Sequence, residues 1–196
     1  ADMSNSPTAG LVVIGNEILS GRTRDANIQF FAASLGKIGV PLVEVRVVPD
    51  IENDIIDALN TLRARTTYVF TTGGIGPTHD DITAASVAKA FKVSLVRHQP
   101  SVEKMEKHYG DKLNSARLKM ADLPEGAEPI ETRITSAPGF RIENVFVMAG
   151  VPVIAEAMLD AVAGSLSHGV PIQSRYVESH MGEGDLADAL TAIQSD

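Results

Sequence analysis

The segment from Thr71 to Asp81 reads Thr-Thr-Gly-Gly-Ile-Gly-Pro-Thr-His-Asp-Asp and combines residue types that are suited to phosphate chemistry. Its glycines can adopt positive φ values and let the main chain approach a ligand closely. The segment follows an apolar stretch and precedes a helical pattern, a position where free main-chain N–H groups bind anions. Two carboxylates beside a bound phosphate also suit Mg²⁺. We therefore expect a phosphate-binding loop with Asp80 and Asp81 as metal ligands.

Simpler interpretations of this loop stay open. Asp80 or Asp81 could act only as the N-cap of the helix that follows. The loop matches neither common phosphate motif, because no Lys-Ser or Lys-Thr follows the glycines and the spacing is not Gly-x-Gly-x-x-Gly. His79 lies inside the loop and could orient a phosphate or transfer a proton near neutral pH.

Other polar residues stand close to the starts of predicted helices. Asp25 and Asn27 precede an apolar pattern of helical spacing, and Asp50 precedes another, so N-capping is the simpler interpretation of each. Capping does not exclude a part in binding or catalysis. Ser20 and Thr78 carry hydroxyl groups that could bond to phosphate oxygens or to the edge of a ring.

The elements that would position these residues alternate along the chain. Short β-branched runs predict buried strands, and apolar residues at helical spacing predict helices. The predicted strands cover 10–15, 41–48 and 67–71, and the predicted helices cover 28–38, 51–62 and 82–91. This alternation predicts a mostly parallel, doubly wound sheet with helices on both faces, an α/β fold of three layers. The loops after the strands then meet at the carboxyl edge of the sheet, where open sheets bind ligands.

The second half of the chain is less regular. Residues 98–121 are polar and helix-rich, and residues 145–148 predict a further strand, followed by a helix. An extended segment at 171–181 and a helix at 184–193 come last. We expect a disordered or tag-derived tail at 1–8, a main domain at 9–168, and a small carboxy-terminal α+β segment at 169–196 that could belong to a truncated unit.

Composition excludes several classes of function. The chain has 196 residues, 17 Lys and Arg against 25 Asp and Glu, and a formal net charge of -8. Binding to nucleic acid or to an anionic membrane needs clustered positive charge, so neither partner is expected. No apolar run approaches the roughly 20 residues of a membrane span. The absence of cysteine excludes disulfides, zinc–thiolate sites and cysteine nucleophiles. Together with the lack of a visible signal peptide, it fits the cytoplasmic location that we expect.

Several motifs resemble those of one known family. They are Gly15-Asn-Glu-Ile-Leu-Ser-Gly21, Asp25 with Asn27, the run Thr72–Thr83, Ala137-Pro-Gly-Phe140 and Gly150-Val-Pro152. Over roughly residues 9–165 the chain resembles the molybdopterin-binding domain family, and most of all the amino-terminal domain of competence/damage-inducible protein A. The long Gly-Gly-x-Gly-Pro-Thr-His-Asp-Asp string is specific to that subgroup.

The resemblance implies a three-layer α/β/α fold that binds molybdopterin or an adenine dinucleotide, with Mg²⁺ as cofactor. It implies chemistry at a pyrophosphate bond, either adenylyl transfer or hydrolysis of ADP-ribose-type compounds, with Asp50 and Asp81 as catalytic residues. It also implies a homo-oligomer, a dimer or a trimer. The expected binding residues are Gly15, Glu17, Ser20, Gly21, Asp25, Asn27, Thr72, Gly73, Gly74, Gly76, Pro77, Thr78, His79, Gly150 and Pro152.

The chain departs from the family pattern at three places. The family's Gly-Asp-Glu motif has Asn16 at its centre here, which removes a negative charge and leaves Glu17 as the acid. Thr132-Arg133 stands in place of Asn-Pro, and Ala149 stands in place of a proline. Two alternatives to catalysis therefore stay open. One is a module that binds molybdopterin without chemistry, and the other is an oligomeric platform for a separate catalytic protein.

Overall fold

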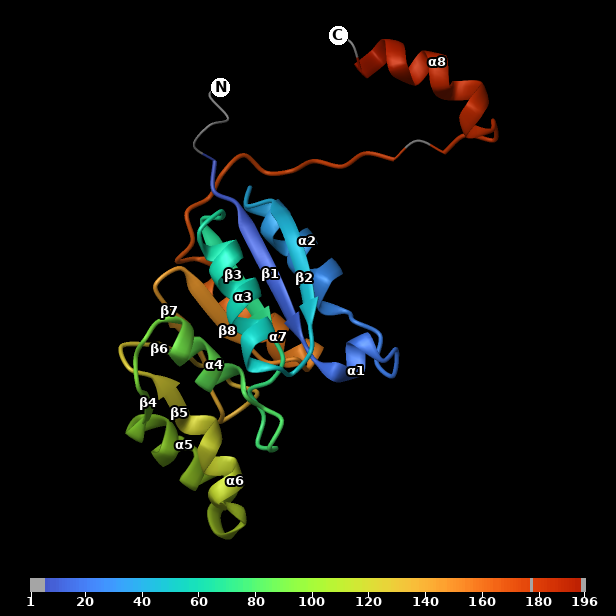
Figure 1. Ribbon diagram of the computed structural model, residues 1–196. Helices are drawn as coiled ribbons and strands as arrows, with labels where there is room; N and C mark the ends of the chain where they lie inside the picture. Colours follow the sequence, from blue (N-terminus) through green and yellow to red (C-terminus); the bar gives the residue numbers. More distant parts are fainter. Residues whose placement is uncertain (1–5, 177, 195–196) are drawn as a thin grey trace.

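The computed structural model describes residues 6–176 and 178–194, and its centre is a six-stranded sheet (Figure 1). In sheet order the strands are β2 (Leu42–Val48), β1 (Ala9–Ile14), β3 (Tyr68–Thr72), β8 (Val145–Met148), β7 (Gly139–Ile142) and β6 (Glu128–Ile130). The first four strands run parallel, and β7 and β6 are antiparallel to their neighbours. The predicted mostly parallel sheet is confirmed, and β6 and β7 are additions that the sequence analysis did not predict.

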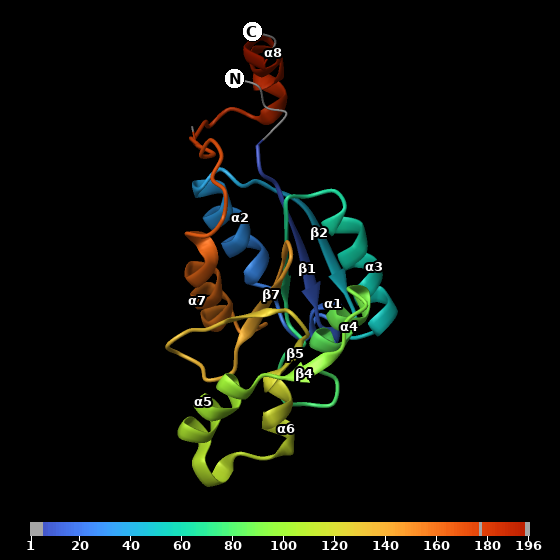
Figure 2. The same ribbon diagram turned by 90° about the vertical axis from the view of Figure 1, so that its left-hand side faces the viewer.

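Helices cover both faces of this sheet (Figure 2). One face packs against α2 (Asn27–Lys37) and α7 (Pro152–Ala163). The opposite face packs against α3 (Glu52–Arg63) and α4 (Thr83–Ala90). The fold is therefore the three-layer α/β/α arrangement that the alternating pattern predicts.

Each face of the sheet has its own hydrophobic core, because alternate side chains of a strand point to opposite faces. Phe31 of α2 and Met158 of α7 are buried on one face together with Phe70 of β3. On the other face Leu59 of α3 is buried against Val12 of β1. These two cores hold the carboxyl ends of the parallel strands in a fixed register, which determines where the loops after them begin.

Between α4 and β6 the chain leaves the main sheet and forms a small unit at residues 95–124, here called the excursion. It contains β4 (Leu95–Arg97), α5 (Gln99–Tyr109), η2 (Gly110–Lys112), α6 (Ser115–Leu118), η3 (Lys119–Ala121) and β5 (Asp122–Pro124). β4 and β5 pair antiparallel and close the unit at its base. The excursion lies on the side of the molecule toward which the parallel strands point (Figures 1 and 2). Its helices were expected, whereas its two strands of three residues are too short for a recognisable alternating pattern.

The segments that flank residues 9–168 are tied to the main body near Thr8 and up to Ile172. Residues 1–5 of the expected tail lie outside the described residues, but Pro7 is buried and Thr8 O accepts a bond from Tyr68 N at 3.0 Å. Near the other end, Gly169 N donates to Ile38 O at 3.0 Å and Ile172 N donates to the end of α2. The main body therefore extends a few residues beyond the predicted 9–168 at both ends.

After Ile172 the chain extends away from the body and forms α8 (Glu183–Gln194), which stands apart from the other elements (Figure 1). α8 buries none of its residues, and Leu190 and Ile193 are exposed. The expected α+β segment thus consists of this helix, without a strand in residues 169–176 and 178–194. In the whole described part of the chain, no helix combines the length and the apolar character needed to cross a bilayer.

Candidate functional site

A cavity of about 590 Å³ opens at the carboxyl edge of the parallel strands. Its volume lies in the range of about 300–1,000 Å³ that is usual for small-molecule sites. The loop after β3, the turn before α7, α1 (Asn16–Leu19) and the excursion contribute its walls. Eight predicted site residues line it: Glu17, Gly73, Gly74, Gly76, Pro77, Asp81, Gly150 and Pro152.

The glycine loop after β3 follows a path that other residues could not follow. Gly73 has a φ of 98° and Gly74 a φ of 70°. A Cβ on Gly73 would lie 2.1 Å from Ile14 O, and a Cβ on Gly74 would lie 2.1 Å from Thr83 Oγ1. Along this path, the N–H groups of Gly74, Ile75 and Gly76 find no acceptor among the described residues. All three residues line the cavity, so these donors are available to an anion.

Thr83 fastens this loop to the start of α4. Its hydroxyl donates to Gly73 O at 2.9 Å, and its N–H donates to Gly74 O at 3.0 Å. The side chain is fully buried. Thr83 ends the motif that carries the family resemblance, but its bond to Gly73 was not predicted, because a separation of ten residues between two bonded groups in a loop carries no recognisable pattern.

Asp80 and Asp81 end the loop, and both carboxylates turn back to Thr78. Asp81 Oδ2 accepts from Thr78 N at 2.8 Å and from Thr78 Oγ1 at 2.6 Å, and Asp80 Oδ1 lies 2.5 Å from the same hydroxyl. The N-cap of α4 is Ile82, without a side-chain cap bond. The interpretation of Asp80 or Asp81 as a helix cap is therefore wrong. The reason is that the loop forms its own turn before the helix starts.

The two acids differ in their environment. Asp81 is partly buried and lines the cavity, whereas Asp80 is exposed and does not. The hydrogen bond from the Thr78 hydroxyl, helped by a main-chain N–H and by the positive charges of His79 and Lys119, lowers the pKa of Asp80. Asp80 is therefore ionised at neutral pH.

Asp50 and Asn16 hold each other at the ends of β1 and β2. Asn16 N donates to Asp50 Oδ2 at 3.0 Å, and Asp50 N donates to Asn16 Oδ1 at 3.2 Å. The N-cap of α3 is Ile51, without a side-chain bond, so the interpretation of Asp50 as a helix cap is wrong. The position that departs from the family pattern thus carries a residue whose amide oxygen fixes Asp50.

Burial raises the pKa of Asp50, and the negative charges of Glu17, Asp80 and Asp81 act in the same direction. The hydrogen bond from Asn16 N opposes them. The predicted catalytic residues and the neighbouring acids therefore lie close enough for their charges to interact. The excess of negative charge is greatest at this end of the cavity.

The residues before α2 have two different roles. Asp25 Oδ2 accepts from Ile28 N at 2.8 Å and so stabilises the first turn of α2, although the N-cap residue of that helix is Ala26. Asn27 lies inside α2, and its Nδ2 donates to Gly150 O at 3.0 Å, so it positions the turn before α7 and does not cap a helix. Neither residue lines the cavity itself.

Some buried polar atoms near the cavity have no partner among the described residues. One is Oδ1 of Asn27, the residue whose Nδ2 donates to Gly150 O, and another is Oγ1 of Thr72, the residue before Gly73. Thr132 Oγ1 and Ser136 Oγ belong to the same segment as the lining residue Thr135. Buried polar groups without a protein partner mark places where a ligand or ordered water completes the bonding.

Other predicted binding residues lie outside the cavity lining. Ser20 Oγ donates to Glu17 O at 3.3 Å, His79 is exposed, and Gly21 takes a φ of 75° in the turn after α1. Gly15 leaves room for the Glu17 carboxylate, because a Cβ at position 15 would lie 2.5 Å from it. Thr78 fixes the two carboxylates that follow it, as described above.

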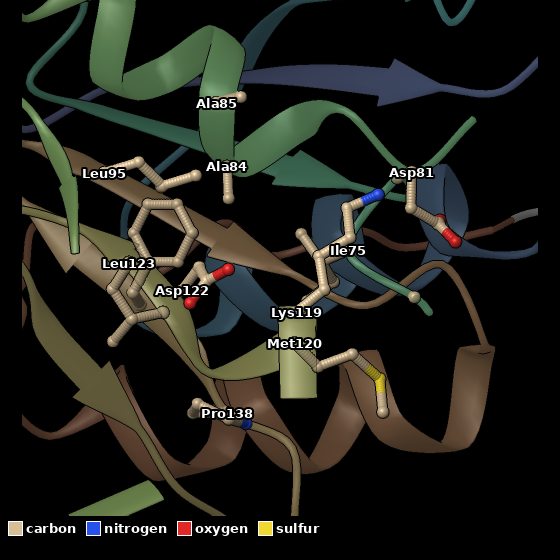
Figure 3. Close-up of a pocket in the computed structure, with 13 residues that line it drawn as sticks. Ile75, Asp81, Ala84, Ala85, Leu95, Lys119, Met120, Asp122, Leu123 and Pro138 are labelled. Atoms are coloured by element: carbon tan, nitrogen blue, oxygen red, sulfur yellow. The ribbon is translucent and has the colours of Figure 1, made fainter. Parts of the chain in front are cut away.

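The excursion adds residues that the sequence analysis did not place in the site. Tyr109, Arg117 and Met120 line the cavity. Lys119 Nζ donates to Thr78 O at 2.7 Å and ties the excursion to the glycine loop. Beside it lies a smaller hollow of about 40 Å³, between the loop and the excursion, lined by residues such as Ile75, Lys119 and Met120 (Figure 3). No spacing signal in the sequence connects these segments, since only the folding of the excursion brings them together.

The protein side chains at this site are too few to hold a metal ion without oxygen atoms from a bound ligand. In the described ranges, no group of three His, Cys, Asp or Glu could hold a metal ion. Mg²⁺ in phosphate sites commonly takes one or two carboxylates and completes its shell with phosphate oxygens and water. Of the two expected ligands, Asp81 lines the cavity and Asp80 does not, so the donor set fits Mg²⁺ only in the presence of a bound phosphate.

The fold and the site together define the class of protein. The model of the family described as "Probable molybdopterin binding domain" matches residues 10–168, and the chain belongs to this family. The crystal structure of the protein CinA from Thermoplasma acidophilum, described as of unknown function, aligns with a TM-score of 0.77. It is 33% identical and covers 82% of this chain and 98% of that chain. The tungsten cofactor synthesizing protein MoaB of Pyrococcus furiosus has a TM-score of 0.55 at 20% identity, covering 82% of this chain and 92% of its own, which shows the fold alone.

Two curated relatives are similar over most of the chain. A protein of Aeropyrum pernix is 37% identical over 165 residues, which make up 81% of this chain and 62% of the relative. A protein of Caldivirga maquilingensis is 34% identical over 192 residues, which make up 94% of this chain and 74% of the relative. The chain thus spans less than two thirds of the first relative's length. The family resemblance and the fold class expected from the sequence are confirmed.

Proposed function

We propose that this protein binds a phosphorylated pterin or an adenine dinucleotide at the carboxyl edge of the sheet and acts, with Mg²⁺, on its pyrophosphate bond. One observation carries the proposal: three free main-chain N–H groups, of Gly74, Ile75 and Gly76, share a cavity with the Asp81 carboxylate. Amide donors bind a phosphate, and a carboxylate beside them suits a cation on the same phosphate. Membership of the molybdopterin-binding family supports a pterin as one form of the ligand.

In this proposal the chain's own residues divide the work. The glycine-loop amides hold phosphate oxygens, Asp81 holds the cation, and Asp50 assists from the end of β2. Bound Mg²⁺ would neutralise charge on the phosphoryl oxygens. A raised pKa makes the Asp50 carboxylate a stronger base, which suits the removal of a proton from the attacking group.

The test is hydrolysis of ADP-ribose with Mg²⁺, followed by chromatography of the products. We expect Asp81→Asn to lower turnover by at least about 100-fold, because the loss of one charge removes the cation. The amide oxygen still accepts from Thr78, so the melting temperature should stay unchanged. Asp111→Asn is the control, because it removes the same charge at an exposed position in the excursion. Full turnover by the Asp81→Asn protein would exclude the proposed role of Asp81.

A module that binds without chemistry is the second candidate, and Asn16 favours it because the acid of the family motif is missing. Thermal-shift measurements with ADP-ribose, FAD, NAD and molybdopterin, each with and without Mg²⁺, separate the two. A ligand at 100 times its Kd stabilises the folded state by about 2.7 kcal/mol. A shift without product formation supports the binding module. No shift with any compound would contradict both candidates and favour the oligomeric platform.

Two further expectations remain proposals. A dimer or trimer follows from the family resemblance, and light scattering after size exclusion would measure it. A cytoplasmic location is supported by the absence of cysteine, and cell fractionation would test it.

A further inference from the structure

Arg117 is a cavity residue without an acidic partner. Its guanidinium lies over the Tyr109 ring, 4.9 Å from the ring centroid, and its Nη1 donates to Lys112 O. The ion pairs found in the described residues do not include Arg117, and its Nε and Nη2 have no acceptor there. Because Arg117 lines the cavity, these donors are available to an anion that comes from outside the chain.

The local structure holds this guanidinium in one place. Asn114 Oδ1 accepts from Arg117 N at 2.9 Å and caps α6. Two residues after Arg117, Lys119 bonds to Thr78 O and fixes the same segment to the glycine loop. The guanidinium is planar by resonance, and its cation–π contact with the Tyr109 ring restricts where it lies. Arg117 is thus pre-positioned as part of the cavity wall.

The charges of the cavity are divided between its two sides. Glu17, Asp81 and the nearby Asp50 place negative charge at the end formed by α1 and the glycine loop. Arg117 places positive charge on the wall formed by the excursion. A single phosphate on the loop amides leaves the guanidinium unsatisfied, whereas two linked phosphates can contact both walls. The planar fork of arginine matches phosphate oxygens in pairs.

We propose that Arg117 binds the second phosphate of a pyrophosphate-bearing ligand and thereby selects such ligands over monophosphates. Tyr109 acts as its positioning residue. The assignment rests on the proposed function, because it assumes that the glycine-loop amides hold the first phosphate. It concerns a residue of the excursion, outside every motif that carried the family resemblance.

The experiment compares ADP-ribose with AMP by isothermal titration calorimetry. Arg117→Ala should weaken ADP-ribose by about 10- to 100-fold, since a charge-assisted hydrogen bond is lost, and AMP by less than about threefold. Arg117→Lys keeps the charge but loses the fork, so its affinity for ADP-ribose should be intermediate. Lys107→Ala is the matched control, because it removes a positive charge from the excursion at an exposed position without a contact to Arg117. It should leave both affinities within about twofold of the original values.

The possible results distinguish this proposal from the function on which it rests. If the unaltered protein binds neither compound, the proposed function itself fails. If it binds both, and Arg117→Ala keeps its affinity for ADP-ribose or weakens both equally, the assignment of Arg117 alone is overturned. Melting curves check that each variant folds, and Arg117→Gln replaces the alanine variant if that one unfolds.

The role of Tyr109 has its own readout. Tyr109→Leu should weaken ADP-ribose more than AMP, and should cause no further loss in the Arg117→Ala background, because it acts through the guanidinium. Equal losses in both backgrounds would overturn the positioning role.

Discussion

Single polar residues at the carboxyl edge hold one another before any ligand arrives. Asp50 and Asn16 exchange two hydrogen bonds, and Thr78 contacts both carboxylates that end the loop. A site whose charged groups are fixed in advance spends little energy on reorganisation when it binds a phosphate. The clustering of acids also lowers the stability of the protein without a ligand, because the negative charges repel one another.

Asp50 should show this cost as a pH-dependent stability. Its folded pKa is raised above the ordinary value of 3.8, so the folded state binds a proton more strongly than the unfolded state. The ionised side chain therefore destabilises the protein at neutral pH, and this penalty disappears as the pH falls through the raised pKa. Asp50→Asn should accordingly raise the free energy of unfolding at pH 7 in metal-free buffer, with the gain lost below about pH 3.8.

Denaturant titrations at several pH values measure this effect. Asp80→Asn is the comparison of opposite sign, because the pKa of Asp80 is lowered and its charge favours the folded state above that pKa. An Asp50→Asn protein that is less stable than the original at pH 7 would contradict the prediction.

Among the elements, the glycine loop depends on how closely it passes the end of β1. Gly73→Ala should lower the free energy of unfolding by about 3 kcal/mol or more, because it adds a main-chain clash to the cost of about 1–2 kcal/mol for a positive φ. The clash is with Ile14 O, 2.1 Å from the new Cβ. Binding of ADP-ribose should be lost as well, since the loop must move.

Gly21→Ala separates these two contributions. Gly21 also has a positive φ, of 75°, but a Cβ there meets nothing within 4 Å. Urea denaturation should therefore show a loss of only about 1–2 kcal/mol for this variant. Similar losses of unfolding free energy for the two glycine variants would show that the close approach of Gly73 to β1 does not contribute to stability.

The excursion is the element that turns an open sheet edge into a cavity. Its contributions, Tyr109, Arg117 and Met120, come from a segment whose sequence predicts only a polar, helix-rich stretch. The Lys119 bond to the glycine loop explains why this unit, closed by two short strands, keeps a defined position. The glycine loop and the wall opposite are therefore expected to respond together to a ligand.

At the scale of the whole molecule, the body and α8 are nearly independent. α8 buries none of its residues, whereas residues 169–172 bond to the end of α2. A chain that stops after Gln173 should keep its free energy of unfolding within about 0.5 kcal/mol and should keep its affinity for ADP-ribose.

A chain that stops after Ser167 is the matched comparison. It also loses the bonds from Gly169 to Ile38 and from Ile172 to Gly36, and should be less stable by about 1–2 kcal/mol. Denaturation of both shortened chains gives the answer. A large loss of stability on removal of residues 174–196 alone would contradict this prediction. It would mean that α8 packs against the main body of the same chain or of a second copy.

The sequence by itself determined the three-layer fold, the positions of the first three strands along the chain and the family. Strands with apolar β-branched runs and helices with apolar spacing leave periodic signals, because each buries one face or both faces over many residues. The glycines and doubled aspartate likewise marked the loop that lines the cavity, since positive φ and negative charge restrict the residue type locally.

Only the tertiary structure decided what these residues do together. Local rules favoured helix caps for Asp50 and Asp81. Packing of β1 beside β2 instead brings Asp50 to Asn16, and a turn within the glycine loop brings Asp81 to Thr78. Arg117 carried no signal, because its place in the cavity wall depends on how the excursion packs and not on its own periodicity. The position of the excursion over the sheet edge, which creates the cavity, also depends on packing between elements and left no pattern in the sequence.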